Sequence, residues 1–121
     1  MRSKAHEEIE RVVKKIRGVE GVIGVVLFGS FSRGDYDEGS DIDLLAVFED
    51  REKLNSGLEE VYRTTAQTDL FLQVIGLTLN ELRRSPLLES VLRDGKTYYA
   101  NEDVEKLLTP THRRFALVTY G

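Results

Sequence analysis

The stretch 28-FGSFSRGDYDEGSDIDL-44 joins two apolar runs, Val22–Phe28 and Asp41–Phe48. Apolar, β-branched runs of this length that are bounded by glycine and polar residues are typical of buried strands. The segment between them is polar and contains three glycines, Gly29, Gly34 and Gly39, a composition that predicts a loop. We therefore expect two core strands joined by a loop with polar side chains, with a short helical turn after Ser30.

The residues outside this stretch alternate between helical and strand patterns. Residues 4–17 have the apolar stripe of an amphipathic helix. Downstream we expect a helix capped by Asp50 and running to about Arg63, a strand over 69–77, a helix capped by Thr78 with Glu81 in the capping-box position, a helix over 86–93, a strand over 96–100, a helix to 108 and a final strand over 113–120. This order predicts an α+β (α/β) fold with a mixed β-sheet flanked by helices, in a single domain over 1–121 with 110–121 unassigned.

The composition excludes several classes of protein. The 121 residues include no cysteine, which rules out disulfides, thiolate zinc sites and thiol catalysis. No apolar run approaches the ~20 residues that cross a bilayer, and the N-terminus lacks the apolar stretch of a signal peptide, so we expect a cytoplasmic protein with no membrane contact. The formal net charge of -4 argues against a protein that coats nucleic acid.

The Gly29-Ser30 pair lies where the first core strand is expected to end. Glycine lets a backbone approach a ligand closely, and a helix that begins near Ser30 would direct its N–H groups at a phosphate. The same pair also fits an ordinary strand-to-helix turn with serine as the N-cap. Both interpretations stay open on these two residues alone.

Asp41 and Asp43 are two residues apart on the second expected strand, so their carboxylates face the same way while Ile42 and Leu44 face the core. Two adjacent carboxylates repel each other unless a cation lies between them, and oxygen ligands favour Mg²⁺ or Mn²⁺. The alternative is a pair of acids on an exposed strand edge. Seven of the 21 acids lie between Arg33 and Arg51 with no basic residue among them, which favours bound cations. A phosphate cradle before a metal site suits phosphoryl or nucleotidyl transfer.

Together, Gly29-Ser30-x-x-Arg33-Gly34 and Ser40-Asp41-Ile42-Asp43-Leu44 resemble the signature of the DNA polymerase beta-like nucleotidyltransferase superfamily. The short chain resembles the minimal nucleotidyltransferase branch. The resemblance implies the polymerase beta-like fold and a Mg²⁺- or Mn²⁺-dependent transfer of a nucleoside monophosphate, AMP from ATP, to a hydroxyl acceptor. It also implies metal binding by Asp41 and Asp43, and nucleotide binding by Gly29, Ser30, Arg33, Gly34 and Ser40. Arg33 would contact a phosphate or pair with a nearby acid.

A third carboxylate on a later strand completes the site in that family. Asp69 is the only acid on the third expected strand, and we predict it as the third catalytic and metal-binding residue. Counting back from Thr78 with the family's spacing gives Gln73 instead, about 13 Å away along a strand. With Gln73 in this position the chain would be a weak enzyme or a nucleotide-binding relic, because glutamine is no base.

The resemblance also implies partners, because minimal members of the family often accompany a small helical HEPN-type protein. In one hypothesis the acceptor hydroxyl belongs to such a partner. In the other, the chain is an antitoxin-like or regulatory nucleotide-binding module that acts by binding the partner, with weak or no catalysis. Residues 111–121 would pair at a sheet edge, which suggests a homodimer.

Overall fold

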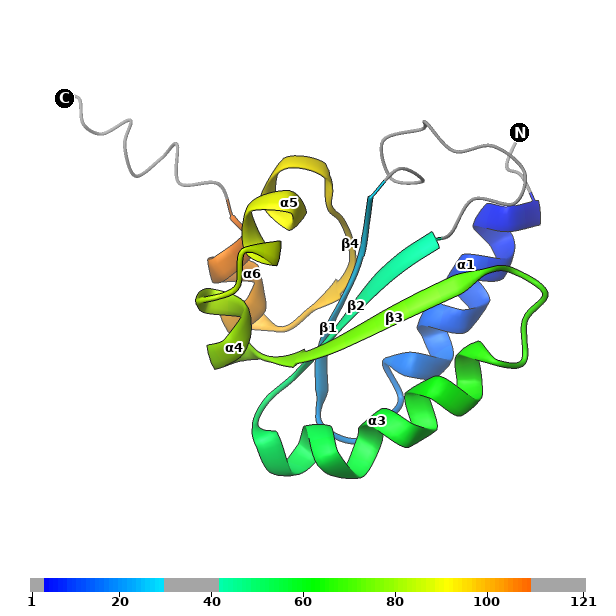
Figure 1. The fold of residues 1–121 in the computed structure, drawn as a ribbon, viewed down its shortest axis with the longest axis horizontal. Helices are drawn as coiled ribbons and strands as arrows, with labels where there is room; N and C mark the ends of the chain where they lie inside the picture. The colour runs from blue at the N-terminus through cyan, green and yellow to red at the C-terminus, as the bar shows by residue number, and fades with distance from the viewer. Residues whose placement is uncertain (1–3, 30–41, 110–121) are drawn as a thin grey trace, which may run out of the picture.

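The computed structural model describes residues 4–29 and 42–109, which form a mixed sheet between two layers of helices (Figure 1). The strand order is β3-β2-β1-β4, with β2 and β3 parallel and the other two neighbouring pairs antiparallel. In chain order the elements are α1 (Lys4–Ile16), β1 (Val22–Phe28), β2 (Ile42–Phe48), α3 (Arg51–Thr65), β3 (Leu72–Thr78), α4 (Leu79–Arg83), α5 (Leu87–Asp94), β4 (Lys96–Ala100) and α6 (Glu102–Leu108).

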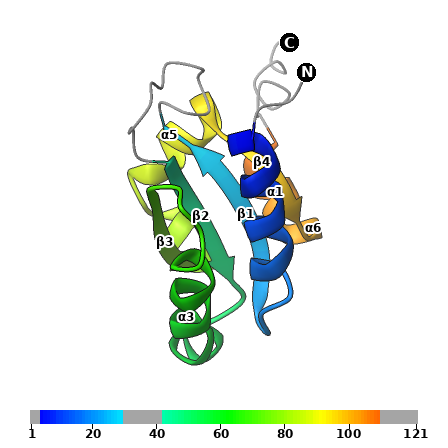
Figure 2. The same ribbon diagram turned by 90° about the vertical axis from the view of Figure 1, so that its right-hand side faces the viewer.

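The two faces of the sheet are covered by different helices, as Figure 1 and Figure 2 show. On one face, Ile42 and Leu44 belong to a core that α1 and α3 complete. On the other, Leu45 and Val47 pack with residues of α4, α5 and α6. Because β1 and β2 lie in the middle of the sheet, both of their faces are buried, which explains their nearly continuous apolar sequences. The mixed sheet flanked by helices confirms the predicted fold class.

Helices α1 and α3 form where the sequence predicts them. The stripe of α1 is fully buried against the sheet and consists of Ile9, Val12, Val13 and Ile16. Asp50 is the N-cap of α3, and its side chain accepts a hydrogen bond from the backbone N–H of Lys53 at 2.8 Å. No helix in the described ranges has both the length and the apolar character that a bilayer crossing requires.

The prediction for the third strand is wrong at its start, because β3 begins at Leu72 and not at Asp69. A local turn precedes the strand. The Thr68 hydroxyl accepts a hydrogen bond from the backbone N–H of Leu70 at 3.3 Å, and the N–H of Leu72 donates to the carbonyl of Leu70 at 3.0 Å. Side-chain bonds of this kind offer the backbone an alternative to strand pairing. Asp69 therefore lies in a bend before β3.

The later elements agree with the sequence pattern, with one shift. Pro86 is the N-cap of α5, so this helix spans 87–94 and not 86–93. Asn101 caps α6, which ends at Leu108 as expected. The turn expected after Ser30 and the strand expected over 113–120 lie outside the described residues.

Thr78 ends β3 and caps α4 in the predicted capping box. Its hydroxyl accepts from the backbone N–H of Glu81 at 3.1 Å, while the Glu81 carboxylate accepts from the backbone N–H of Thr78 at 3.0 Å. We expect Thr78→Ala to lower the free energy of unfolding by about 1 kcal/mol, because both the cap and its reciprocal bond are disturbed. Urea denaturation measures this change.

A control for that experiment is Ser56→Ala in α3. The Ser56 hydroxyl is exposed and donates to the carbonyl of Glu52 within the same helix, so its removal should change stability by less than about 0.5 kcal/mol. Equal stabilities for Thr78→Ala and Ser56→Ala would contradict a stabilising role for the capping box.

Candidate functional site

One end of the sheet brings together the last residues of β1 and the first residues of the other three strands. Phe28 and Asp43 are partners in the antiparallel β1–β2 pair, and Asp43 and Gln73 are partners in the parallel β2–β3 pair. On the other side of β1, Leu27 is the partner of Lys96 at the start of β4. Asp43 therefore has β1 on one side and β3 on the other, and the start of β4 lies two strands away, beyond β1.

Asp43 lies on the face of the sheet that α4, α5 and α6 cover. Successive side chains of a strand alternate between faces, so Asp43 shares its face with Leu45 and Val47 of the second core. Ile42 and Leu44 belong to the opposite core, as the sequence predicts. Asp43 itself is half-buried at the open end of this face.

Gly29 follows β1 and lies directly against the Asp43 carboxylate. Its φ is +83°, a conformation that residues with a side chain rarely adopt. A Cβ atom at this position would lie 2.4 Å from Oδ2 of Asp43. The glycine therefore keeps a side chain of its own away from the carboxylate oxygen, and it also permits the turn that ends the strand.

Gln73 is the residue of β3 that faces Asp43. Partner residues in a parallel pair project to the same face, and neighbouring strands lie about 4.8 Å apart. The Gln73 side chain is exposed, whereas Leu77, further along the same face of β3, packs against the α4–α6 core. The position beside Asp43 is thus held by a neutral amide.

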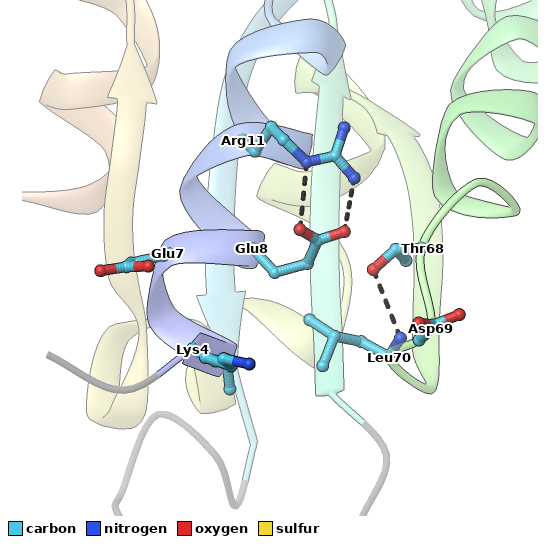
Figure 3. Close-up of a pocket in the computed structure, with 8 residues that line it drawn as sticks. Lys4, Glu7, Glu8, Arg11, Thr68, Asp69 and Leu70 are labelled. Atoms are coloured by element: carbon cyan, nitrogen blue, oxygen red, sulfur yellow. Dashed lines mark hydrogen bonds and ion pairs between the residues drawn. The ribbon is translucent and has the colours of Figure 1, made fainter.

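Asp69 lines a pocket of about 510 Å³ between α1 and the bend before β3 (Figure 3). The pocket is formed by Lys4, Ala5, Glu7, Glu8 and Arg11 of α1, together with Thr68, Asp69 and Leu70. Figure 3 shows the Asp69 carboxylate directed away from the Glu8–Arg11 pair. Because α1 covers the face opposite to that of Asp43, the structure does not bring Asp69 and Asp43 together on one face of the sheet.

The electrostatic interaction that shifts pKa values in this pocket is an ion pair between two of its lining residues, Glu8 and Arg11 of α1. Arg11 Nε donates to Glu8 Oε1 at 3.0 Å, and Arg11 Nη2 forms an ion pair with Glu8 Oε2. The guanidinium, followed by the Thr68 hydroxyl, lowers the pKa of Glu8 to about 2, and Glu8 in turn raises the pKa of Arg11. The carboxylate thus stays ionised until the pH falls toward 2, and its ion pair with Arg11 lies within α1 on the exposed side of the helix.

Several of the predicted site residues cannot be placed. Ser30, Arg33, Gly34, Ser40 and Asp41 lie outside the described residues. Within 4–29 and 42–109, no group of three His, Cys, Asp or Glu side chains is arranged to hold a metal ion. The described part of the candidate site therefore consists of Gly29 and Asp43 from the predicted set, with Gln73 beside them.

Comparisons with known proteins give a family for the chain and solved structures of similar fold. The family model described as a nucleotidyltransferase domain matches residues 6–117. Among solved structures, the chain is similar to a candidate nucleotidyltransferase from Sulfolobus solfataricus, with 25% identity over 79% of this chain and 80% of that chain and a TM-score of 0.55. No curated protein matches the chain significantly.

Two further solved structures share the fold at lower identity. One is a toxin–antitoxin with AMP-PNP, which is 22% identical over 88% of this chain and 86% of that chain, with a TM-score of 0.60. The other is a tri-AMPylated Shewanella oneidensis HEPN toxin in complex with an MNT antitoxin, at 18% identity over 91% of this chain and 89% of that chain, with a TM-score of 0.54.

Proposed function

The chain belongs to the nucleotidyltransferase domain family, and from this premise we propose that it transfers AMP from ATP to a hydroxyl group of a protein partner. The observation that carries the proposal is the contact between Gly29 and Asp43 at the open end of the sheet. It joins one residue from each half of the loop-and-strand signature, 14 positions apart in the sequence, around one carboxylate oxygen.

The residues at this end of the sheet fit a divalent metal ion. Carboxylate oxygens are the preferred ligands of Mg²⁺ and Mn²⁺, and the missing side chain at Gly29 leaves space beside Oδ2 of Asp43 that a Cβ would fill. Asp43 and Asp41 would hold the ion, which would neutralise charge on the triphosphate when bound. Gly29 and Ser30 would hold phosphate oxygens through backbone N–H groups and the serine hydroxyl, with Arg33, Gly34 and Ser40 completing the nucleotide site.

In the proposed reaction, the acceptor hydroxyl oxygen forms a bond to the α-phosphorus while the bond from this phosphorus to pyrophosphate breaks. The hydroxyl proton leaves to solvent or to a carboxylate of the site. The protein's contribution is to fix the triphosphate in line with the acceptor and to stabilise the charge that develops on the phosphoryl oxygens.

Labelled ATP tests this function. The chain would be incubated with Mg²⁺, ATP labelled at the α-phosphate and a purified HEPN-type protein, and mass spectrometry would then locate AMP on the partner. We expect a mass increase of AMP on a hydroxyl side chain. If the chain neither binds ATP nor transfers AMP to the partner, the proposal is contradicted.

A specific observation favours a second candidate function, that of a nucleotide-binding module that controls its partner by forming a complex. The position of β3 beside Asp43 is held by the neutral Gln73, so β3 supplies no carboxylate there. A stable complex with the HEPN-type protein in the presence of ATP, without any AMP on that protein, supports this second function over transfer.

Whether Asp69 is the third acid of the site can be tested by substitution. We expect Asp69→Asn to leave ATP binding and transfer within about twofold of wild type, because Asp69 lies in a bend on the α1 side of the sheet. Transfer rates at saturating ATP measure the effect. A loss of about tenfold or more would restore Asp69 as a member of the site.

A further inference from the structure

We propose that the exposed face at the start of β3 is the docking surface for the acceptor protein, and that it binds an apolar segment next to the acceptor hydroxyl. The surface consists of Phe71, Gln73 and Ile75, which are all exposed and which we call the β3 strip. The inference rests on the proposed function and identifies the part of the chain that recognises the acceptor.

The β3 strip is exposed although the rest of the same sheet face is covered by helices. Leu77, near the end of β3, packs with the core that α4, α5 and α6 complete. Ile75, two residues closer to the start of the strand, is 37% exposed, and Phe71, directly before the strand, is 63% exposed. Large apolar side chains that are exposed together mark interaction sites, whereas a single one is ordinary.

Phe71 projects to the same side as the rest of the strip. Its neighbours Leu70 and Leu72 both pack against the core on the α1 and α3 side, and successive side chains of an extended chain point in opposite directions. The carbonyl of Phe71 accepts a hydrogen bond from the backbone N–H of Ile42 at 2.8 Å, which holds this residue beside β2. The strip therefore continues past the end of β3 as one surface.

The β3 strip is continuous with the candidate site, because its middle residue, Gln73, is the register partner of Asp43. Neighbouring strands lie about 4.8 Å apart, so a molecule that lies along the strip brings its groups beside the Asp43 carboxylate. The proposed reaction requires the acceptor hydroxyl at this place. The Gln73 amide can both donate and accept hydrogen bonds, so it can bind the backbone or the hydroxyl of a docked segment.

The chemistry of the strip indicates what it binds. Residues 70–79 contain no charged side chain, whereas binding of a nucleic acid depends on basic residues that contact its phosphates. Phe71 and Ile75 instead supply apolar area, and aromatic residues with few charges around them are typical of the buried centre of a protein–protein interface. The occupant that fits is thus a protein segment with an apolar side chain close to its acceptor hydroxyl.

Binding and transfer measured with the purified HEPN-type protein test this proposal. We expect Phe71→Ala to lower the affinity of the complex by about tenfold or more in calorimetry, and to raise the KM for the HEPN-type protein by a similar factor. The rate at a saturating concentration of this protein and the affinity for ATP should stay within about twofold of wild type. Ile75→Thr keeps the β-branched shape that suits a strand and should weaken the complex in the same direction.

Tyr62→Ala is the matched control, because it also removes an exposed aromatic ring. Tyr62 is 49% exposed and belongs to α3, the helix on the opposite face of the sheet. Its removal should leave the affinity and the KM within about twofold of wild type. Photoreactive benzoylphenylalanine in place of Phe71 should crosslink to the HEPN-type protein on illumination, and the same group in place of Tyr62 should not.

The outcomes separate the docking surface from the proposed function. Affinities and KM values that are the same in Phe71→Ala, Ile75→Thr and wild type would overturn the docking surface and leave nucleotide transfer intact. A complex that weakens in Phe71→Ala but never carries AMP would support the surface and contradict transfer. If the HEPN-type protein does not bind the wild-type chain at all, both proposals fail.

Two other occupants of the β3 strip would also be recognised. If Phe71→Ala lowers only the affinity for ATP, the ring contacts the nucleotide. If analytical ultracentrifugation shows a dimer of the wild-type chain that Phe71→Ala dissociates, while the affinity for the HEPN-type protein is unchanged, the strip binds a second copy of the chain. Either result would overturn the proposal.

Discussion

Asp43→Asn is expected to reduce AMP transfer by about 100-fold or more while the protein stays folded. The change preserves the size of the side chain and removes the negative charge that the proposed site uses to hold a divalent ion beside the triphosphate. The neighbouring residues on the same face are Phe28 and Gln73, and neither carries a charge that could replace it. Transfer of labelled AMP measures the loss, and circular dichroism monitors the fold.

The chain offers a matched control in Asp50→Asn. Asp50 follows β2 at the opposite end of the sheet and caps α3 through its side chain. Asparagine is as good an N-cap as aspartate, so this variant loses the same charge without losing the cap. We expect its transfer rate and stability to match those of wild type. Equal losses in Asp43→Asn and Asp50→Asn would show that net charge, and not a site at Asp43, governs the activity.

The sequence predicted the elements that depend on local patterns. The apolar runs gave both central strands, and the stripe of α1 gave its buried face, because a period of 2 or 3.6 is visible in the residues themselves. The caps at Asp50 and Thr78 were recognisable because both residue types favour the N-cap position, where the side chain accepts a hydrogen bond from a backbone N–H three positions further on. The alternation of Ile42, Asp43 and Leu44 likewise indicated which side chain leaves the core.

The third position of the site was harder, because it depends on strand register. Asp69 was predicted because it is the only acid on the strand expected over 69–77. The turn at Thr68, however, keeps it out of β3. The other signal was Thr78, whose capping box fixes where β3 ends. Counting back from that residue gives Gln73, and the register places Gln73 beside Asp43. Which of the two residues takes part in the reaction stays a prediction, which Asp69→Asn tests.

The contact of Gly29 with Asp43 was not predictable from the sequence. Its separation of 14 positions spans the whole loop, and nothing in the local pattern states that β1 and β2 pair with Phe28 opposite Asp43. Periodicity assigns residues to faces but does not determine which residues are cross-strand partners. The structure therefore adds a steric role for Gly29 to the phosphate-binding role that the sequence suggests.

Gly29→Ala is expected to damage both stability and transfer. The substitution places a Cβ at a φ of +83° and 2.4 Å from Oδ2 of Asp43, so the backbone and the carboxylate must both move. Strain of this kind costs about 1–3 kcal/mol of unfolding free energy. A displacement of about 1 Å in a catalytic group can reduce a rate by about 100-fold, which is the loss of transfer that we expect.

Gly21→Ala separates these two effects, because it repeats the steric problem away from the site. Gly21 precedes β1 at the other end of the sheet, with a φ of +92°, and a Cβ there would lie 2.4 Å from Cβ of Lys53. It should lose a similar amount of stability and keep its transfer rate at temperatures where it is folded. If Gly29→Ala loses no more transfer than Gly21→Ala, the contact with Asp43 serves only the fold, and the space beside Oδ2 is not part of the reaction.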